Sequence, residues 1–225
     1  GKRMRLVVFD LDGTLIDSEA LIVESVSEAF RAVNQPVPEV RAIRAISGIT
    51  ARDAIAILAP GADEARVDVL LESYVSHYRQ RSGASIEPLF RGALELLDRL
   101  QASPETILAV ATGKGYSGAV TLLERHGIVG RFNSIETPTH NRGKPDPQMI
   151  HTAMDKAGVD AAHTVMLGDT VHDMRMARAA GVKAIAVAWG YHEIADLREA
   201  GADVVVREFS EIDARIDELI GAVDA

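Results

Sequence analysis

LVVFDLDGT, at residues 6–14, joins a short apolar run to a pair of acidic residues. Four consecutive apolar residues, two of them β-branched, are typical of a strand that is buried on both faces of a sheet. Similar runs predict further strands at 107–111, 164–167, 183–188 and 203–206, with a weaker candidate at 134–136.

Helical patterns lie between most of these runs, at 116–126, 147–157 and 173–180. Strands that alternate with helices form parallel sheets, because the chain must cross back over the sheet between two parallel strands. The sequence therefore predicts an α/β fold with a doubly wound parallel sheet of the Rossmann kind.

One interval breaks this alternation. Residues 17–83 carry helical patterns only, and Pro36 and Pro38 end the first of them. We predict an α/β core domain made of residues 1–16 and 84–225, with an all-helical cap domain, residues 17–83, inserted after the first strand.

The composition disfavours several classes of partner. The chain has 225 residues, with 24 basic and 33 acidic side chains and a formal net charge of −9. A surface of that sign repels nucleic acid and anionic membranes, and no apolar run approaches the ~18 residues of a membrane span. The lack of cysteine excludes disulfides and thiolate chemistry, and we expect a cytoplasmic protein. Monomer and homodimer are equally compatible with the sequence.

Acidic residues that follow the strands predict a metal site. Ligands of open α/β sheets bind beyond the carboxyl ends of the strands, and Asp10, Asp12, Asp169 and Asp173 would meet there. These like charges repel one another unless a cation lies among them. A set of oxygen ligands favours Mg²⁺ over zinc.

Three further residues at the same edge suit a phosphate group. Thr112 offers a hydroxyl, Gly113 an unhindered backbone N–H and Lys144 a positive charge. An aspartate can attack phosphorus, and a neighbouring carboxyl group can carry the proton. Asp10 and Asp12 therefore predict chemistry on a small phosphorylated metabolite.

Four segments, taken in order, resemble the motifs of the haloacid dehalogenase superfamily. They are DLDGTLID at 10–17, TG at 112–113, KPDP at 144–147 and GDTVHD at 168–173. The helical insert resembles the cap of the subfamily that contains phosphoglycolate phosphatase and β-phosphoglucomutase. The resemblance implies a phosphatase, similar to phosphoglycolate phosphatase, that uses Mg²⁺ and forms an aspartyl-phosphate intermediate.

The resemblance also implies roles for the four aspartates. Asp10 would be the nucleophile and a ligand of Mg²⁺. Asp12 would be the acid and base, and its backbone carbonyl would bind the metal. Asp169 would bind Mg²⁺ directly, and Asp173 would do so through water or by supporting the direct ligands.

For the phosphate-binding residues, the resemblance implies that Thr112 and the Gly113 amide hold the transferring phosphoryl group, while Lys144 neutralises its charge. Many relatives carry Asn or Ser at the position of Gly113. This chain keeps the backbone donor there and lacks the side-chain contact.

Three other functions share parts of this pattern. A phosphosugar mutase of the β-phosphoglucomutase type has the same aspartate pair, but typically carries a histidine early in the cap, where residues 18–21 have none. Haloacid dehalogenases generally lack an acid at the position of Asp12. A phospho-receiver module also has an acidic cluster, but it is shorter and has no helical insert.

A glycine pattern, GKGYSG at 113–118, matches the G-x-G-x-x-G of dinucleotide sites. It follows an interior strand rather than the first one, and it leaves Asp10, Asp12 and Asp169 without a role. We therefore disfavour a dinucleotide site.

Smaller predictions concern residues around these motifs. Asp17, with Ser18 in reach, is predicted to cap the first helix of the insert, and His172 to be an exposed loop residue. The loop at 47–50 is a candidate for contact with the substrate. The arginines at 41, 44 and 52 are predicted to lie on solvated faces, with one of them able to reach a substrate anion.

Overall fold

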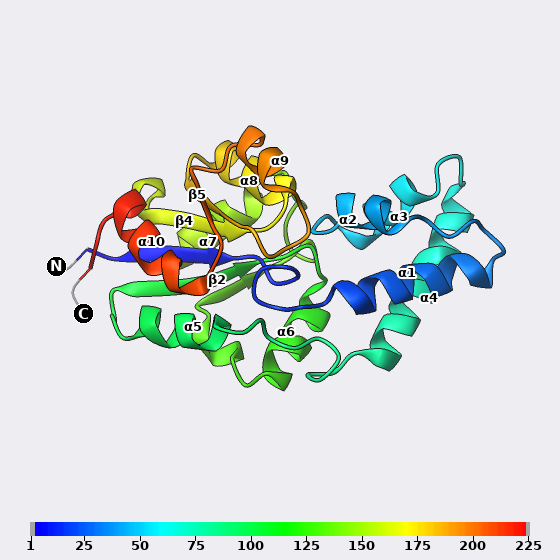
Figure 1. Ribbon diagram of the computed structural model, residues 1–225, viewed down its shortest axis with the longest axis horizontal. Coiled ribbons are helices and arrows are strands. Elements are labelled where there is room, and N and C mark those ends of the chain that lie inside the picture. Colours follow the sequence, from blue (N-terminus) through cyan, green and yellow to red (C-terminus); the bar gives the residue numbers. More distant parts are fainter. Residues whose placement is uncertain (1–2, 224–225) are drawn as a thin grey trace.

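The computed structural model describes residues 3–223. Its centre is a six-stranded sheet in the order β3-β2-β1-β4-β5-β6, in which all neighbouring strands are parallel (Figure 1). The strands are β1 (Arg5–Phe9), β2 (Thr106–Ala111), β3 (Ser134–Glu136), β4 (Thr164–Gly168), β5 (Lys183–Val187) and β6 (Val204–Val206). The predicted fold class is confirmed.

Helices cover both faces of the sheet. One hydrophobic cluster joins the sheet to α5 (Ala93–Gln101), α6 (Tyr116–Arg125) and α10 (Ile212–Ile220), and a second joins it to α7 (Gln148–Ala157), α8 (Val171–Ala180) and α9 (Ile194–Glu199). Along β1, Val7 and Phe9 belong to the first cluster and Leu6 and Val8 to the second. Both faces of β1 are buried, which explains why its residues 6–9 are all apolar.

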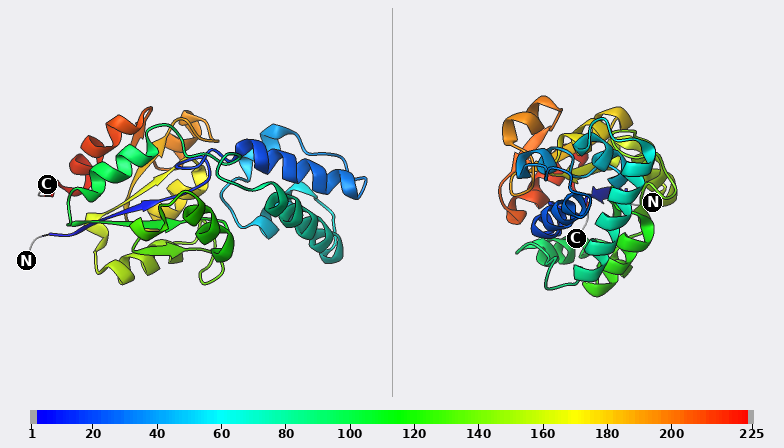
Figure 2. Two further views of the ribbon diagram at one scale, coloured as in Figure 1. Left: turned by 90° about the horizontal axis from the view of Figure 1, so that it is seen from below. Right: turned by 90° about the vertical axis from the view of Figure 1, so that its right-hand side faces the viewer.

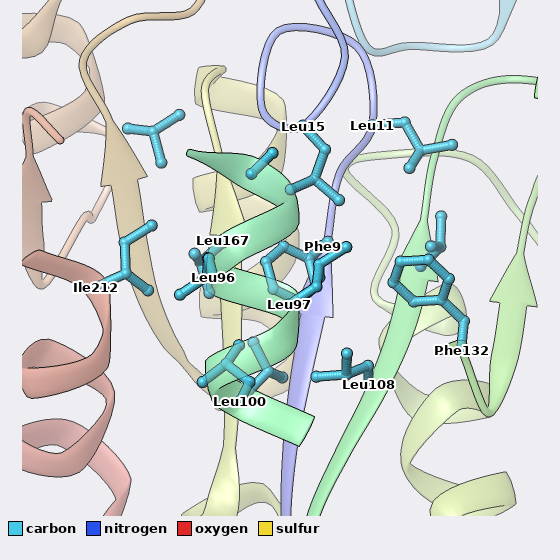
Figure 3. Packing of buried hydrophobic residues seen from close by; sticks show 14 of the residues in the cluster. Phe9, Leu11, Leu15, Leu96, Leu97, Leu100, Leu108, Phe132, Leu167 and Ile212 are labelled. Carbon is cyan, nitrogen blue, oxygen red and sulfur yellow. The ribbon is translucent and has the colours of Figure 1, made fainter. Parts of the chain in front are cut away.

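Figure 3 shows the first of these clusters. The leucines of α5 pack over Phe9 of β1, and Phe132 lies edge-on to the Phe9 ring, with ring centroids 6.4 Å apart. Helices α5, α9 and α10 lie outside the helices that the sequence patterns predicted.

Five α-helices lie between β1 and β2, and the first four of them are α1 (Glu19–Ala32), α2 (Val40–Ala45), α3 (Ala51–Leu58) and α4 (Glu64–Arg81). They share a hydrophobic cluster of their own, with Phe30, Ile43, Ile55 and Leu70 among its buried members. Figures 1 and 2 show these helices beyond the carboxyl ends of the strands, at the opposite end from the start of β1. We call them the helical module; its status as a separate domain with boundaries at 17 and 83 stays a prediction.

The two connections to the helical module run side by side. The amide of Asp17 donates to the carbonyl of Pro88 at 2.8 Å, and the amide of Phe90 donates to the carbonyl of Leu15 at 2.9 Å. The module is therefore held to the sheet at one edge by paired backbone. Among the residues described, no helix has the length and apolar character needed to cross a membrane.

Candidate active site

The sheet order brings the motif residues together. Strands β2, β1 and β4 are neighbours, and Thr112, Asp10 and Asp169 follow their carboxyl ends directly. Lys144 comes from the loop before α7, and Asp173 from the first turn of α8. All five side chains are buried.

Three carboxylates form one cluster. Asp10, Asp169 and Asp173 each place an oxygen within 4.8 Å of the others. Lys144 is the cation among them, with Nζ 3.1 Å from Asp10 Oδ1 and 2.6 Å from Asp173 Oδ1. Three buried acids face one buried base, so the cluster carries excess negative charge.

The pKa values of the cluster show where this charge is poorly compensated. Burial, reinforced by Asp173, raises the pKa of Asp10 well above its ordinary value and that of Asp169 to about 7. Burial also acts to raise the pKa of Asp173, but the charge of Lys144 outweighs it and holds that pKa below its ordinary value. Lys144 is thus committed to Asp173, while Asp10 and Asp169 lack a full counter-charge.

The two undercompensated acids are held in place by different donors. Asp10 Oδ1 accepts from the Leu11 amide at 2.7 Å, whereas its buried Oδ2 has no hydrogen-bond partner among the residues described. Asp169 accepts from Thr14 Oγ1 at 3.0 Å and from the Tyr191 amide at 2.9 Å. The donor set is oxygen only, is buried and leaves one carboxylate oxygen free, so these residues fit a divalent cation.

Gly13 makes room for this arrangement. Its φ is +80°, and a Cβ there would lie 2.1 Å from Asp169 Oδ2. Any other residue would be strained in the backbone and would also collide with the carboxylate. The glycine of the first motif therefore has a steric role at the acidic cluster.

Asp12 has separate surroundings. Its Oδ1 accepts from Ser18 Oγ at 2.6 Å, and its Oδ2 lies 3.1 Å from Lys114 Nζ. Lys114 also donates to the Tyr78 hydroxyl at 2.9 Å and sits 4.6 Å from the centroid of the Tyr78 ring. The carboxylate of Asp12 is therefore turned away from the acidic cluster and toward the helical module.

The loop at 47–50 covers the end of β2. A Cβ on Gly113 would lie 2.3 Å from the carbonyl oxygen of Gly48 and 2.8 Å from that of Ile49. Only a residue without a side chain allows so close an approach between these two backbones. This contact gives a physical reason for glycine, rather than Asn or Ser, at position 113.

A pocket of about 770 Å³ lies between the helical module and the core. Asp12 and Gly113 border it, so it opens onto the same place as the acidic residues. Its other walls come from α1, α3, α4, the loop at 46–49 and residues 113–125. The site thus consists of the acidic cluster at the end of the sheet and, next to it, the pocket under the helical module.

Comparison with known proteins assigns the chain to a family. Residues 7–187 match the model of the haloacid dehalogenase-like hydrolases. The chain belongs to this family. It is 39% identical over 212 residues to a probable phosphatase, IndB, of Dickeya dadantii, with 92% of this chain and 91% of the relative covered. It is 34% identical over 210 residues to a phosphoglycolate phosphatase of Agrobacterium fabrum, with 91% and 89% covered.

A solved hydrolase from Pseudomonas syringae has the same fold, with a TM-score of 0.85, 26% identity and 97% and 100% of the two chains covered. The resemblance to the haloacid dehalogenase superfamily is therefore confirmed, and with it the expectation of an enzyme, a hydrolase related to phosphatases.

Several residues of this haloacid dehalogenase-like site were not among the predicted site residues. Lys114 and Tyr78 contact Asp12 or its partner, Thr14 orients Asp169, and Tyr191 holds Ser18 through a 2.9 Å contact between hydroxyl groups. Lys114 directly follows Thr112 and Gly113, and this position next to a motif could have indicated that it belongs to the site. The others come from segments whose approach depends on tertiary structure.

Two local predictions were wrong. Ser18 stands at the N-terminus of α1 without a capping hydrogen bond from its side chain, and Asp17 precedes it; the Ser18 hydroxyl is used by Asp12 instead. His172 lies in α8 rather than in a loop, and its Nε2 donates to the carbonyl of Ala45 at 3.0 Å.

The arginines at 41, 44 and 52 do not border the pocket. Arg44 pairs with Glu19 and Arg52 with Asp68, each at 2.5 Å, and Arg41 is exposed. Their placement agrees with the predicted solvated faces.

Proposed function

We propose that this protein is a Mg²⁺-dependent phosphatase that hydrolyses a small phosphate monoester through a phosphoryl group carried on Asp10. One observation carries the proposal. Oδ2 of Asp10 is buried and lacks a hydrogen-bond partner among the described residues, beside two further carboxylates and a lysine. An unpartnered buried oxygen in such a place is suited to binding a cation or attacking an electrophile.

In the first step, an oxygen of Asp10 attacks phosphorus and the bond from phosphorus to the ester oxygen breaks. Asp12 enters this step in its protonated form and gives that proton to the departing alkoxide. Lys144, buried next to Asp10, and the hydroxyl of Thr112 with the amide of Gly113 would balance the charge on the phosphoryl oxygens. The products of this step are the free alcohol and an aspartyl-phosphate.

In the second step, Asp12 removes a proton from water, and the water oxygen attacks the phosphorus on Asp10. The bond between phosphorus and the Asp10 oxygen breaks, which releases inorganic phosphate and regenerates both aspartates in their starting forms. Ser18 and Lys114 hold the two oxygens of Asp12, so the proton carrier is fixed for both steps.

The metal would be held by Asp10 and Asp169, together with the backbone carbonyl of Asp12. When bound, Mg²⁺ offsets the negative charge of the carboxylates and of the phosphate. Asp173 would support these ligands rather than bind directly, because its Oδ1 pairs with Lys144 and its Oδ2 accepts from the amides of Asp169 and Thr170.

Ser18 favours hydrolysis over the mutase alternative. Phosphosugar mutases of this subfamily typically carry a histidine early in the cap, whereas here a serine hydroxyl contacts Asp12. With β-glucose 1-phosphate as substrate, we expect free phosphate, and formation of glucose 6-phosphate would indicate a mutase.

Phosphate release from a panel of monoesters, including phosphoglycolate, tests the proposal. We expect release to need Mg²⁺, to stop with a chelator and to return when Mg²⁺ is restored. Asp10→Asn should lower turnover by about 10³-fold or more, whereas Asp155→Asn, at an exposed position of α7, should not. Turnover retained by Asp10→Asn would refute the proposed mechanism.

A further inference from the structure

The pocket under the helical module is large for a two-carbon leaving group. Its volume is about 770 Å³, within the ~300–1,000 Å³ typical of sites for drug-sized ligands. The five heavy atoms of glycolate would take about 150 Å³ at the roughly 30 Å³ that a water molecule occupies in the liquid. Most of the pocket would remain filled with water if phosphoglycolate were the substrate.

The side of the pocket formed by the helical module carries apolar side chains that do not pack in the hydrophobic cluster of the module. Ile46, Ile49 and Val75 border the pocket and are half-buried. None of the three belongs to the hydrophobic cluster that holds the module together. Each of the three contributes to the pocket lining, where apolar surface gains free energy only when an apolar group displaces water.

The polar end of the pocket is unsuited to a second anion. Lys114 already pairs with Asp12 at 3.1 Å, and Asp12 and Glu87 outweigh the effect of its burial and hold its pKa above the ordinary value. Glu87 is itself buried and borders the pocket. The other two cations on the lining, Arg79 and Arg125, are exposed. A substrate carboxylate next to the ester would therefore lie near the negative charges of Asp12 and Glu87. The nearby positive charge of Lys114 is already paired with Asp12.

We propose that this pocket binds the organic part of the substrate, and that the substrate is a phosphomonoester of an alcohol with a bulky apolar group rather than phosphoglycolate. The proposal rests on the proposed function, because Asp12 and Gly113 join the pocket to the reacting groups. The apolar group lies against Ile46, Ile49 and Val75, and any polar groups at its far end lie near the exposed arginines.

Ethyl phosphate, hexyl phosphate and phosphoglycolate separate the possibilities. The two alkyl esters have nearly the same leaving-group chemistry, so a difference in kcat/KM reports on binding of the chain. Burial of one methylene group contributes about fourfold, and we expect kcat/KM for hexyl phosphate to exceed that for ethyl phosphate at least ~30-fold. We also expect hexyl phosphate to exceed phosphoglycolate.

Two variants on α4 test the wall itself. Val75→Asn places an amide on the pocket lining and should lower the ratio of kcat/KM for hexyl phosphate to that for ethyl phosphate about tenfold. Val69→Asn is the matched control, because Val69 is 48% exposed and does not border the pocket. Thermal unfolding of both variants checks that they fold.

The outcomes separate this inference from the proposed function. Equal kcat/KM for the two alkyl esters, a preference for phosphoglycolate, or an unchanged ratio in Val75→Asn would each overturn the inference and leave the phosphatase proposal intact. Phosphate release from none of the three esters with Mg²⁺ would instead overturn the proposed function. In that case, calorimetric binding of the two alkyl esters to Asp10→Asn still measures the preference of the pocket, and equal affinities would overturn the inference as well.

Discussion

Lys114 and Asp12 form an ion pair of 3.1 Å at the boundary between the acidic cluster and the pocket. Both side chains are largely buried, with 14% and 13% of their surface exposed. The Tyr78 hydroxyl accepts from the same lysine, and Glu87 accepts from that hydroxyl. The residue that we propose as the proton carrier is thus tied to α4 of the helical module.

Lys114→Met should impair catalysis more than folding. Without the cation, Asp12 loses one of the two contacts that orient it, and Glu87 becomes a nearby charge without compensation. We expect kcat/KM to fall about 10- to 100-fold, less than the full value of a general acid and base. The measurement is steady-state phosphate release, with Lys183→Met, at the exposed first residue of β5, as the control. Wild-type kcat/KM in Lys114→Met would contradict a role for this pair.

Gly113→Ala should displace the loop at 47–50. The new Cβ would lie 2.3 Å from the carbonyl oxygen of Gly48, and a backbone atom cannot yield without movement of the whole turn. We expect kcat/KM to fall roughly 10- to 100-fold, since small misplacements in active sites have effects of that size. Gly130→Ala is the control, because a Cβ there meets nothing within 4 Å and Gly130 does not border the pocket. If both variants keep the wild-type kcat/KM, close contact between this loop and Gly113 is not needed for catalysis.

Asp10→Asn should stabilise the metal-free protein while it abolishes turnover. Burial and the neighbouring acids raise the pKa of Asp10, so its charged form is unfavourable in the fold, and Lys144 keeps its partner Asp173. We expect the Tm in chelator to rise by about 2–4 °C, the shift that ~1 kcal/mol produces in a domain of this size. Added Mg²⁺ should raise the Tm of the wild type more than that of the variant. If the Tm of Asp10→Asn in chelator is lower than that of Asp155→Asn, the negative charge of Asp10 is already balanced by the protein in the absence of metal.

His192→Leu combined with His172→Leu should loosen the contact between core and module. His192 Nδ1 accepts from the Val171 amide at 3.1 Å, so its Nε2 carries the proton and donates to the carbonyl of Arg44 at 2.8 Å. His172 donates to the next carbonyl, that of Ala45. At ~1 kcal/mol for each hydrogen bond, we expect kcat/KM to fall about fivefold per bond and amide exchange at 46–50 to quicken. His151→Leu, at an exposed position of α7, is the control, and unchanged exchange in the double variant would rule out this contact as a restraint.

Much of the fold could be read from short patterns. The apolar runs located all six strands because both faces of each central strand are buried, and the order of strands and helices dictated a parallel sheet. Helices α5, α9 and α10 were not predicted, although their buried leucines and isoleucines complete the sheet-facing clusters. The signal was present in the chain, because Leu96, Leu97 and Leu100 of α5 and Ile212, Ile216 and Ile220 of α10 recur at the spacing of one helix face.

The sequence by itself determined that Asp10 and Asp169 directly follow strands of a parallel sheet, and residues in that position share one edge of the sheet. The structure confirms that these two carboxylates lie in one cluster. Only the tertiary structure decided that Asp12 turns toward Lys114, that the Gly48 backbone packs on Gly113 and that an apolar pocket lies beside them. These features depend on how the helical module sits on the core, and contacts between segments so distant in the chain leave no periodic trace in its sequence.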